Sequence, residues 1–195
     1  QKQVGEVFAR IGGMPEPPVR EMIGSPQPYA YRGKAELHAA RKAGGVHLGF
    51  MDISGGQIAD IERCEIMDET INDQIQKARS LGADLPAQDD FIFWSHPSGH
   101  GDETVTRVVN GREFLVPRTG FFQANLYLTG RMVDEVARLM NEKTRGTVID
   151  ACCGSGLFSI LLAPLAGRMI GVEINEKSVN HARMNAERNN VGNVD

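Results

Sequence analysis

The segment between residues 147 and 189 constrains the fold more than any other part of the sequence. A short apolar run ends in Asp150, a glycine-rich turn follows, and a second apolar run ends near Glu173. The elements expected in order are a strand at 147–149, a helix at 157–165, a strand at 168–174 and a helix at 175–189. This order predicts a βαβα unit of a doubly wound, Rossmann-like α/β sheet.

The turn after the first strand has the sequence DACCGSGLF, residues 150–158. Gly154 and Gly156 allow the backbone to approach a ligand that side chains would otherwise block. Glu173 ends the next strand, where a carboxylate can accept hydrogen bonds from both hydroxyls of a ribose. Ser159 occupies the third position of the dinucleotide glycine fingerprint, which favours S-adenosylmethionine over a dinucleotide. The alternative at this point is a βαβ unit that binds nothing.

Charge and cysteine content set broader limits. The formal net charge is −4, which argues against a small, uniformly basic nucleic-acid binder. Residues 1–50, however, carry seven basic and four acidic side chains, so a basic N-terminal face is compatible with the acidic total. The three cysteines form no spaced disulfide framework, which predicts a cytoplasmic protein. No run of about 18 apolar residues predicts a membrane span.

Upstream of residue 120 the pattern differs. A helix at 2–11 is followed by a proline-rich arm and a β-rich block. We therefore predict three parts: a helix and arm at 1–28, a β-rich domain at 29–120, and at 121–195 a domain that contains the βαβα unit. The further elements expected are strands at 29–40, 46–51, 57–61, 91–94, 104–109 and 113–116, and helices at 69–81 and 123–143.

Basic residues follow the first predicted strand. Arg32, Lys34, Arg41 and Lys42 lie among aromatic residues such as Tyr31. Backbone charge combined with aromatic stacking is the usual means of holding single-stranded RNA. The four residues are therefore predicted to bind RNA, and the alternative is a solvated strand face.

Several motifs together resemble the RNA uracil-5 methyltransferase family, and its bacterial ribosomal RNA enzymes in particular. The resemblance covers nearly the whole chain, and its most specific part is GFFQ-x-N followed by the D-x-x-C-G-x-G loop. The matching segments are YRGK at 31–34, GF at 49–50, IERC at 61–64, GFFQAN at 120–125 and DACCGSG at 150–156.

The resemblance implies a class I methyltransferase domain that binds S-adenosylmethionine, preceded by a smaller β-rich α+β domain. It implies that the domain at 29–120 faces RNA and that residues 121–195 are a truncated methyltransferase domain. The cofactor-binding residues that it implies are Gln123, Cys152, Gly154, Gly156, Leu157 and Glu173. Cys152 stands where many members have an aromatic residue, and Leu157 where several have asparagine, so the side-chain roles at these two positions stay open.

The family reaction is covalent. A cysteine thiolate adds to C6 of uracil, the resulting enolate attacks the sulfonium methyl group through C5, and a carboxylate base removes the C5 proton as the thiolate leaves. By the resemblance, that cysteine and the general-base glutamate lie beyond Asp195. We therefore assign no catalytic residue here and expect the isolated chain, as a fragment, to be inactive.

Cys64 matches the fourth ligand of the [4Fe-4S] cluster in iron–sulfur members of the family, and the alternative is a half-buried thiol. One thiolate cannot hold a cubane cluster, so a cluster is expected only in a longer parent protein. The predicted partner is RNA, ribosomal rather than transfer RNA, with no membrane or protein partner. Two other functions stay open: a class I methyltransferase of a non-RNA substrate, and a non-catalytic RNA-binding module.

Overall fold

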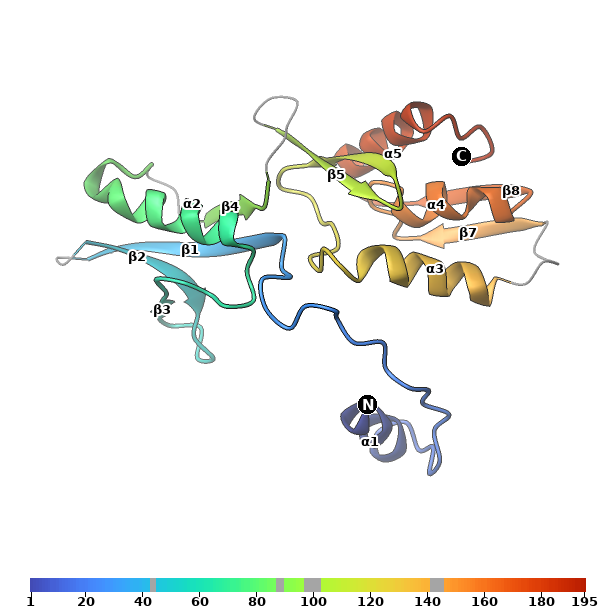
Figure 1. Ribbon diagram of the computed structural model, residues 1–195, viewed down its shortest axis with the longest axis horizontal. Coiled ribbons are helices and arrows are strands. Elements are labelled where there is room, and N and C mark those ends of the chain that lie inside the picture. The colour runs from blue at the N-terminus through green and yellow to red at the C-terminus, as the bar shows by residue number, and fades with distance from the viewer. Residues whose placement is uncertain (43–44, 87–89, 97–102, 141–145) are drawn as a thin grey trace.

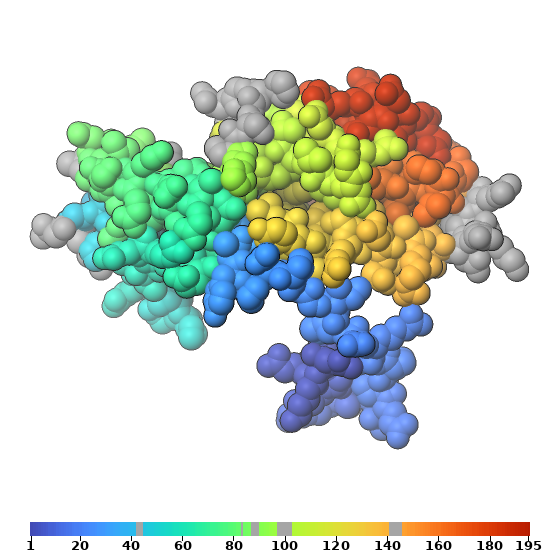
Figure 2. All heavy atoms as spheres, in the orientation of Figure 1, coloured from blue at the N-terminus to red at the C-terminus, as the bar shows by residue number. Residues whose placement is uncertain are grey.

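The computed structural model describes residues 1–42, 45–86, 90–96, 103–140 and 146–195 (Figure 1). An antiparallel sheet and a helix form one end, and a parallel strand pair with its helices forms the other. Helix α1 (Lys2–Arg10) forms a lobe apart from both, which Figure 2 shows in blue at the bottom, and a proline-rich arm joins it to the rest of the protein. No helix among the described residues is long and apolar enough to cross a membrane.

The antiparallel sheet has the strand order β3-β2-β1-β4. Helix α2 packs on it and begins where the Asp68 side chain accepts a hydrogen bond from the Thr70 N–H, as an N-cap residue does. Leu37, Leu48 and Ile71 are fully buried between sheet and helix. The bounds are β1 Lys34–Lys42, β2 Gly45–Met51, β3 Ile58–Asp60, α2 Glu69–Ser80 and β4 Asp90–Trp94.

Gly49 in β2 illustrates how closely this sheet is packed. It lies opposite Asp60 of β3, and a Cβ atom there would come within 1.8 Å of the Ala59 carbonyl oxygen. We predict that Gly49→Ala displaces β3 and lowers the free energy of unfolding by about 1–3 kcal/mol. Gly56→Ala is the control, since the nearest atom to its Cβ would be 3.5 Å away. Equal midpoints for the two variants in urea unfolding would contradict this prediction.

The second half contains a parallel pair, β7 (Thr147–Ala151) and β8 (Arg168–Val172), in register from Thr147 opposite Arg168 to Ala151 opposite Val172. Residues 193–195 add the start of a third parallel strand, because Met169 N–H donates to Asn193 O and Asp195 N–H to Met169 O. The other elements here are β5 Thr104–Val109, β6 Arg112–Pro117, α3 Thr129–Leu139, α4 Leu157–Leu162 and α5 Glu176–Arg188.

The hairpin β5–β6 packs against α5. Phe114 and Val116 of this hairpin share a hydrophobic core with Leu157, Ile160 and Met169, which belong to the βαβα unit. This grouping differs from the predicted division at residue 120, because the hairpin belongs to the C-terminal core. Trp94, at the end of β4, also belongs to that core and thus connects the sheet to it.

The strand expected from residue 29 begins only at Lys34. Residues 31–33 instead lie between two other segments: Gly33 N–H donates to Ala124 O, Leu126 N–H to Tyr31 O, and Arg32 N–H to Ile66 O. Gly33 is required there, because a Cβ atom would lie 2.4 Å from the Leu126 side chain. The YRGK and GFFQAN segments, far apart in sequence, are therefore hydrogen-bonded neighbours.

The helix expected at 123–143 begins at Thr129, six residues late. The cause is Asn125, whose side-chain oxygen accepts the N–H groups of Tyr127 and Leu128, and such side-chain bonding favours a turn before a helix. Residues 141–143 of the prediction lie outside the described residues. The other predicted elements are confirmed to within a few residues.

Candidate functional site

The glycine-rich loop after β7 is fastened to the end of β8. The N–H groups of Cys152 and Cys153 both donate to the Val172 carbonyl oxygen, at 2.7 and 3.1 Å. Cys152, Gly154 and Gly156 all have positive φ angles, of 64°, 56° and 84°. This run of left-handed residues turns the chain sharply from strand to helix at the carboxyl ends of both strands, where doubly wound sheets bind their ligands.

Glu173 lies beside this loop. Its Oε2 accepts the Gly154 N–H at 3.0 Å, and its Oε1 accepts the Asn175 N–H at 2.9 Å. These hydrogen bonds, first that from Asn175, lower the pKa of Glu173. The side chain is therefore an anionic acceptor at neutral pH, fixed in direction by two backbone donors.

The start of helix α4 has its own anchor. The Asp150 carboxylate accepts the Ser159 N–H at 2.9 Å and the Ser159 hydroxyl at 2.6 Å. Gly156 is the N-cap residue, and a Cβ atom there would come within 3.2 Å of the Ala182 Cβ atom. By contrast, a Cβ atom on Gly154 would meet nothing within 4 Å. The loop is therefore closely packed against Ala182 of α5 at Gly156, whereas the space beside Gly154 is open.

Neither cysteine of the loop has the surroundings of an activated nucleophile. Burial, together with the charges of Asp150 and Glu173, raises the pKa of Cys153. A raised pKa keeps the group as a neutral thiol, whereas nucleophilic cysteines need the thiolate. Cys152 is an exposed free thiol.

The structure brings together four of the six predicted cofactor residues. Cys152, Gly154, Gly156 and Glu173 surround one strand end. Leu157 follows directly, but its side chain is only 6% exposed and packs in the core. It can therefore offer a ligand only its backbone.

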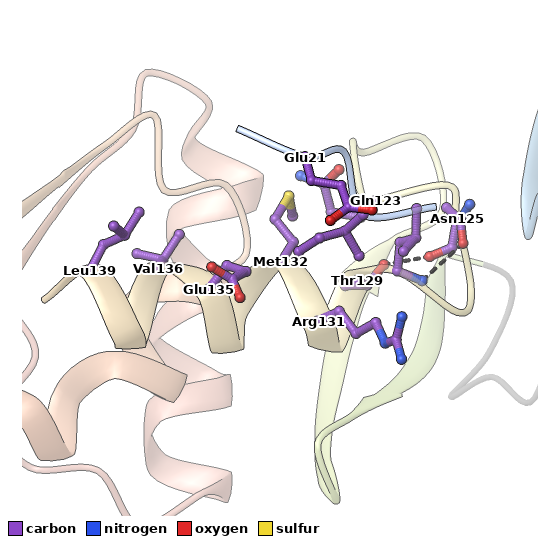
Figure 3. Close-up of a pocket in the computed structure, with 11 residues that line it drawn as sticks. Glu21, Gln123, Asn125, Thr129, Arg131, Met132, Glu135, Val136 and Leu139 are labelled. Carbon is purple, nitrogen blue, oxygen red and sulfur yellow. Dashed lines mark hydrogen bonds between the residues drawn. The ribbon is translucent and has the colours of Figure 1, made fainter. Parts of the chain in front are cut away.

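Gln123 lies elsewhere, in a groove of about 560 Å³ along α3. Figure 3 shows Gln123 and Glu21 at one end of this groove and Val136 and Leu139 toward the other. None of the glycine-loop residues lines it. The structure therefore does not group Gln123 with the other predicted cofactor residues.

Ile174, beside Glu173, was not predicted from the sequence as a site residue. Ile174 directly follows the carboxylate, and its side chain is fully exposed, with a relative accessibility of 101%. An exposed aliphatic group next to a carboxylate that is predicted to bind ribose offers an apolar contact for a base. Its position after the strand-end acid was a usable signal, but its exposure was not, because residue 174 was predicted to lie within a strand.

The four predicted RNA-binding residues do not form one patch. Lys34 and Lys42 are the first and last residues of β1, so they lie roughly 26 Å apart at the rise of an extended strand. Arg41, beside Lys42, donates to the Leu85 and Pro86 carbonyl oxygens. Arg32 Nε donates to the Lys34 carbonyl oxygen, which keeps Arg32 at the other end. The side chain of Lys42 lies outside the described residues.

Arg107 is a further cation at the Lys34 end, and no sequence pattern predicted it there. Lys34 Nζ lies 5.0 Å, and Arg107 Cζ 4.8 Å, from the centre of the Trp94 ring. Both cations donate to backbone carbonyls, Lys34 to Gly120 O and Arg107 to Gly33 O. Burial lowers the pKa of Lys34 and lowers that of Arg107 to about 10. Arg107 therefore stays charged at neutral pH.

Cys64 is half-buried against the core of the antiparallel sheet. Its backbone exchanges hydrogen bonds with the Asn72 side chain. Within the described ranges, no group of three or more His, Cys, Asp or Glu side chains is placed to hold a metal. The residues around Cys64 do not fit an iron–sulfur cluster, which needs four thiolates.

Three features define the class I methyltransferase fold: a parallel strand pair, a glycine loop between strand and helix, and a carboxylate at the end of the second strand. A solved structure supports this class: the Pyrococcus abyssi tRNA (uracil-54, C5)-methyltransferase in complex with S-adenosyl-L-homocysteine superposes with a TM-score of 0.71, at 20% identity over 99% of this chain and 60% of that one.

The family follows from the sequence comparisons. Residues 102–195 match the model of the tRNA (uracil-5-)-methyltransferase family. An RNA methyltransferase of Halalkalibacterium halodurans is 25% identical over 100% of this chain and 57% of its own length. The tRNA (uracil(54)-C(5))-methyltransferase of Schizosaccharomyces pombe is 28% identical over 97% of this chain and 40% of its own. The family model matched by residues 102–195 is that of the family that the resemblance predicted, and the chain spans 57% of the length of the first relative and 40% of the second.

Proposed function

We propose that this chain is the cofactor-binding part of an S-adenosylmethionine-dependent enzyme that methylates C5 of a uridine in RNA. The observation that carries the proposal is the Glu173 carboxylate, hydrogen-bonded to the Gly154 N–H at the carboxyl end of the parallel strand pair. The match of residues 102–195 to the tRNA (uracil-5-)-methyltransferase family model supports the reaction. The relatives named above support RNA as the substrate class.

The residues present fit the adenosyl group of this cofactor. Glu173 would accept the ribose hydroxyls, Ile174 would pack against the adenine ring, and the open side of Gly154 would face the ligand. When bound, the cofactor supplies an electrophilic sulfonium methyl group. The chain's contribution is to bind and orient it, while the cysteine nucleophile and glutamate base of the covalent mechanism are proposed to lie beyond Asp195.

RNA is proposed to approach at the Lys34 end of β1. This end combines Arg32, Lys34 and Arg107 with Phe121, whose ring is 72% exposed. Cations hold the phosphate backbone, and an exposed aromatic ring stacks with an unpaired base. The hydrogen bonds of residues 31–33 to 124–126 support this assignment, because they join the basic segment to the segment that precedes α3.

We predict that Arg32→Glu combined with Lys34→Gln weakens RNA binding by the full-length protein. Each lost phosphate contact should reduce the slope of log K against log salt by about 1. Glutamine is chosen at position 34 because Lys34 is half-buried beside Trp94 and a carboxylate there would be unpaired. Arg41→Glu, at the far end of β1, is the control and should leave the slope within error. An unchanged slope in the double variant would remove this surface from the proposal.

The proposed function is tested with the full-length protein and two RNAs. Transfer of labelled methyl groups to uridine C5 is expected with either ribosomal or transfer RNA transcripts, and the preferred transcript decides between our prediction of ribosomal RNA and the tRNA specificity of the named relatives. S-adenosylhomocysteine binding without methyl transfer to RNA would favour a methyltransferase of another substrate. RNA binding without S-adenosylhomocysteine binding would favour a non-catalytic module.

Two finer points belong to the same proposal. Cys64 is proposed as a cluster ligand only in a longer protein that supplies three further thiolates, and no step of the reaction depends on it. A cytoplasmic location is proposed because all three cysteines are free thiols, as reducing compartments favour.

A further inference from the structure

Asn185, in the middle of α5, is a polar residue with 0% exposure. Burying an amide is costly unless its donors and acceptor are satisfied. Here three hydrogen bonds satisfy it: Oδ1 accepts the Leu115 N–H at 2.7 Å, and Nδ2 donates to Leu115 O at 2.8 Å and to Ser155 O at 2.9 Å. One side chain therefore contacts α5, the β5–β6 hairpin and the glycine loop.

The two bonds to Leu115 explain why an amide is needed. Leu115 lies opposite Thr106 in the hairpin, yet its N–H and C=O both face Asn185, as the outer edge of a strand presents them. A buried strand edge must find partners. The Asn185 amide supplies a donor and an acceptor, as a neighbouring peptide group would.

The third hydrogen bond joins Asn185 to the glycine loop. The Gly154 N–H donates to Glu173, whereas the Ser155 carbonyl oxygen accepts from Asn185 of α5, and Gly156 lies against Ala182 of the same helix. Only an amide of this length has a second N–H left for Ser155 after pairing with Leu115. Aspartate has no donor, and leucine has neither donor nor acceptor.

We propose that Asn185 is a positioning residue for the cofactor, which fixes the glycine loop by tying the Ser155 carbonyl to strand β6. This inference rests on the proposed cofactor site. It makes the β5–β6 hairpin a support of that site, although the hairpin contributes none of the proposed cofactor contacts.

The test is calorimetric titration of the full-length protein with S-adenosylhomocysteine. Asn185→Asp, which preserves shape but loses both donors, should weaken binding about tenfold, as expected for loss of a loop-fixing hydrogen bond with an unpaired carbonyl left behind. The control is Asn189→Asp: Asn189 lies one turn later and also donates to β6, at Glu113 O, but does not contact the loop. It should bind within about twofold of wild type.

Asn185 is fully buried whereas Asn189 is half-buried, so Asn185→Asp costs more stability than Asn189→Asp. Circular dichroism must therefore show that both variants are folded at the titration temperature. Equal affinity of Asn185→Asp and wild type would overturn the inference. Failure of the wild type to bind S-adenosylhomocysteine would instead overturn the proposed function.

If Asn185→Asp does not fold, amide hydrogen exchange in the wild-type protein tests the same inference. Linkage between sites is reciprocal, so S-adenosylhomocysteine should slow amide hydrogen exchange at Leu115 as well as at Gly154–Gly156. Slowing at the loop with no change at Leu115 would overturn the proposed coupling.

Discussion

Replacing Glu173 by alanine should reduce the affinity for S-adenosylhomocysteine about hundredfold, because two charge-assisted hydrogen bonds to the ribose are worth about 3 kcal/mol together. The substitution also removes the acceptor for the Gly154 N–H, so the loop loses its front anchor. Glu173→Gln keeps one acceptor oxygen and should lose about tenfold. Titration calorimetry measures both effects.

Glu176 provides the matched control for this prediction. It is an exposed carboxylate in the first turn of α5, so Glu176→Gln removes the same charge from the same region without removing an anchor of the loop. Its affinity should stay within about twofold of wild type. A similar loss in both variants would indicate a general charge effect and contradict the assigned role of Glu173.

The pH dependence of binding follows from the same carboxylate. Its backbone donors lower the pKa of Glu173, so the acceptor form persists to lower pH than for an ordinary glutamate. Affinity should therefore be constant from about pH 8 down to about pH 5 and fall only below the usual glutamate range. A decline beginning near neutral pH would point to another group.

The second prediction with a large expected effect compares alanine substitutions at the two loop glycines, Gly154 and Gly156. A Cβ atom on Gly154 would enter open space, whereas one on Gly156 would lie 3.1 Å from Ile160 and 3.2 Å from Ala182. Both alanine variants pay about 1 kcal/mol for a left-handed backbone. Gly156→Ala adds crowding of about 1–3 kcal/mol in unfolding free energy.

Ligand binding should show the opposite order. Gly154→Ala places a methyl group where the cofactor is proposed to approach, so the affinity of this variant should fall more than tenfold, while its unfolding free energy falls only by the backbone cost of about 1 kcal/mol. Gly156→Ala, at a temperature where it is folded, should bind closer to wild type. If urea unfolding and calorimetry ranked the two variants in the same order, the open side of the loop would not be the ligand side.

The C-terminal half was the more predictable part of the fold. A strand-end acid, a glycine loop and an apolar helix are local signals, and they gave the positions of β7, α4, β8 and α5 to within a few residues. The start of α3 was missed because Asn125 caps a turn that helical periodicity does not reveal. The prediction of a strand from residue 29 was wrong up to residue 33. These residues instead bond to residues 66–68 and 124–126, which are distant in sequence.

In the candidate site, too, the residues that could be predicted are those with local contacts. Glu173 and the loop glycines belong to one short segment, so spacing alone could place them together. Asn185 and Arg107 act through Leu115 and Gly33, which lie 70 and 74 residues away. Trp94 lies 60 residues from Lys34. A single sequence contains no sign of such pairings. Gln123 came from the family resemblance, and its position along α3 could be seen only in three dimensions.

The shared core of the β5–β6 hairpin has a practical consequence for anyone dissecting the protein. A gene trimmed to begin at residue 121 would remove Phe114 and Val116 from the interior and leave the Asn185 amide buried without its strand. Such a product should precipitate or bind cofactor poorly, whatever the merits of its βαβα unit. Trimming ahead of Thr104 instead preserves the hairpin, and is where separate expression of the C-terminal part should start.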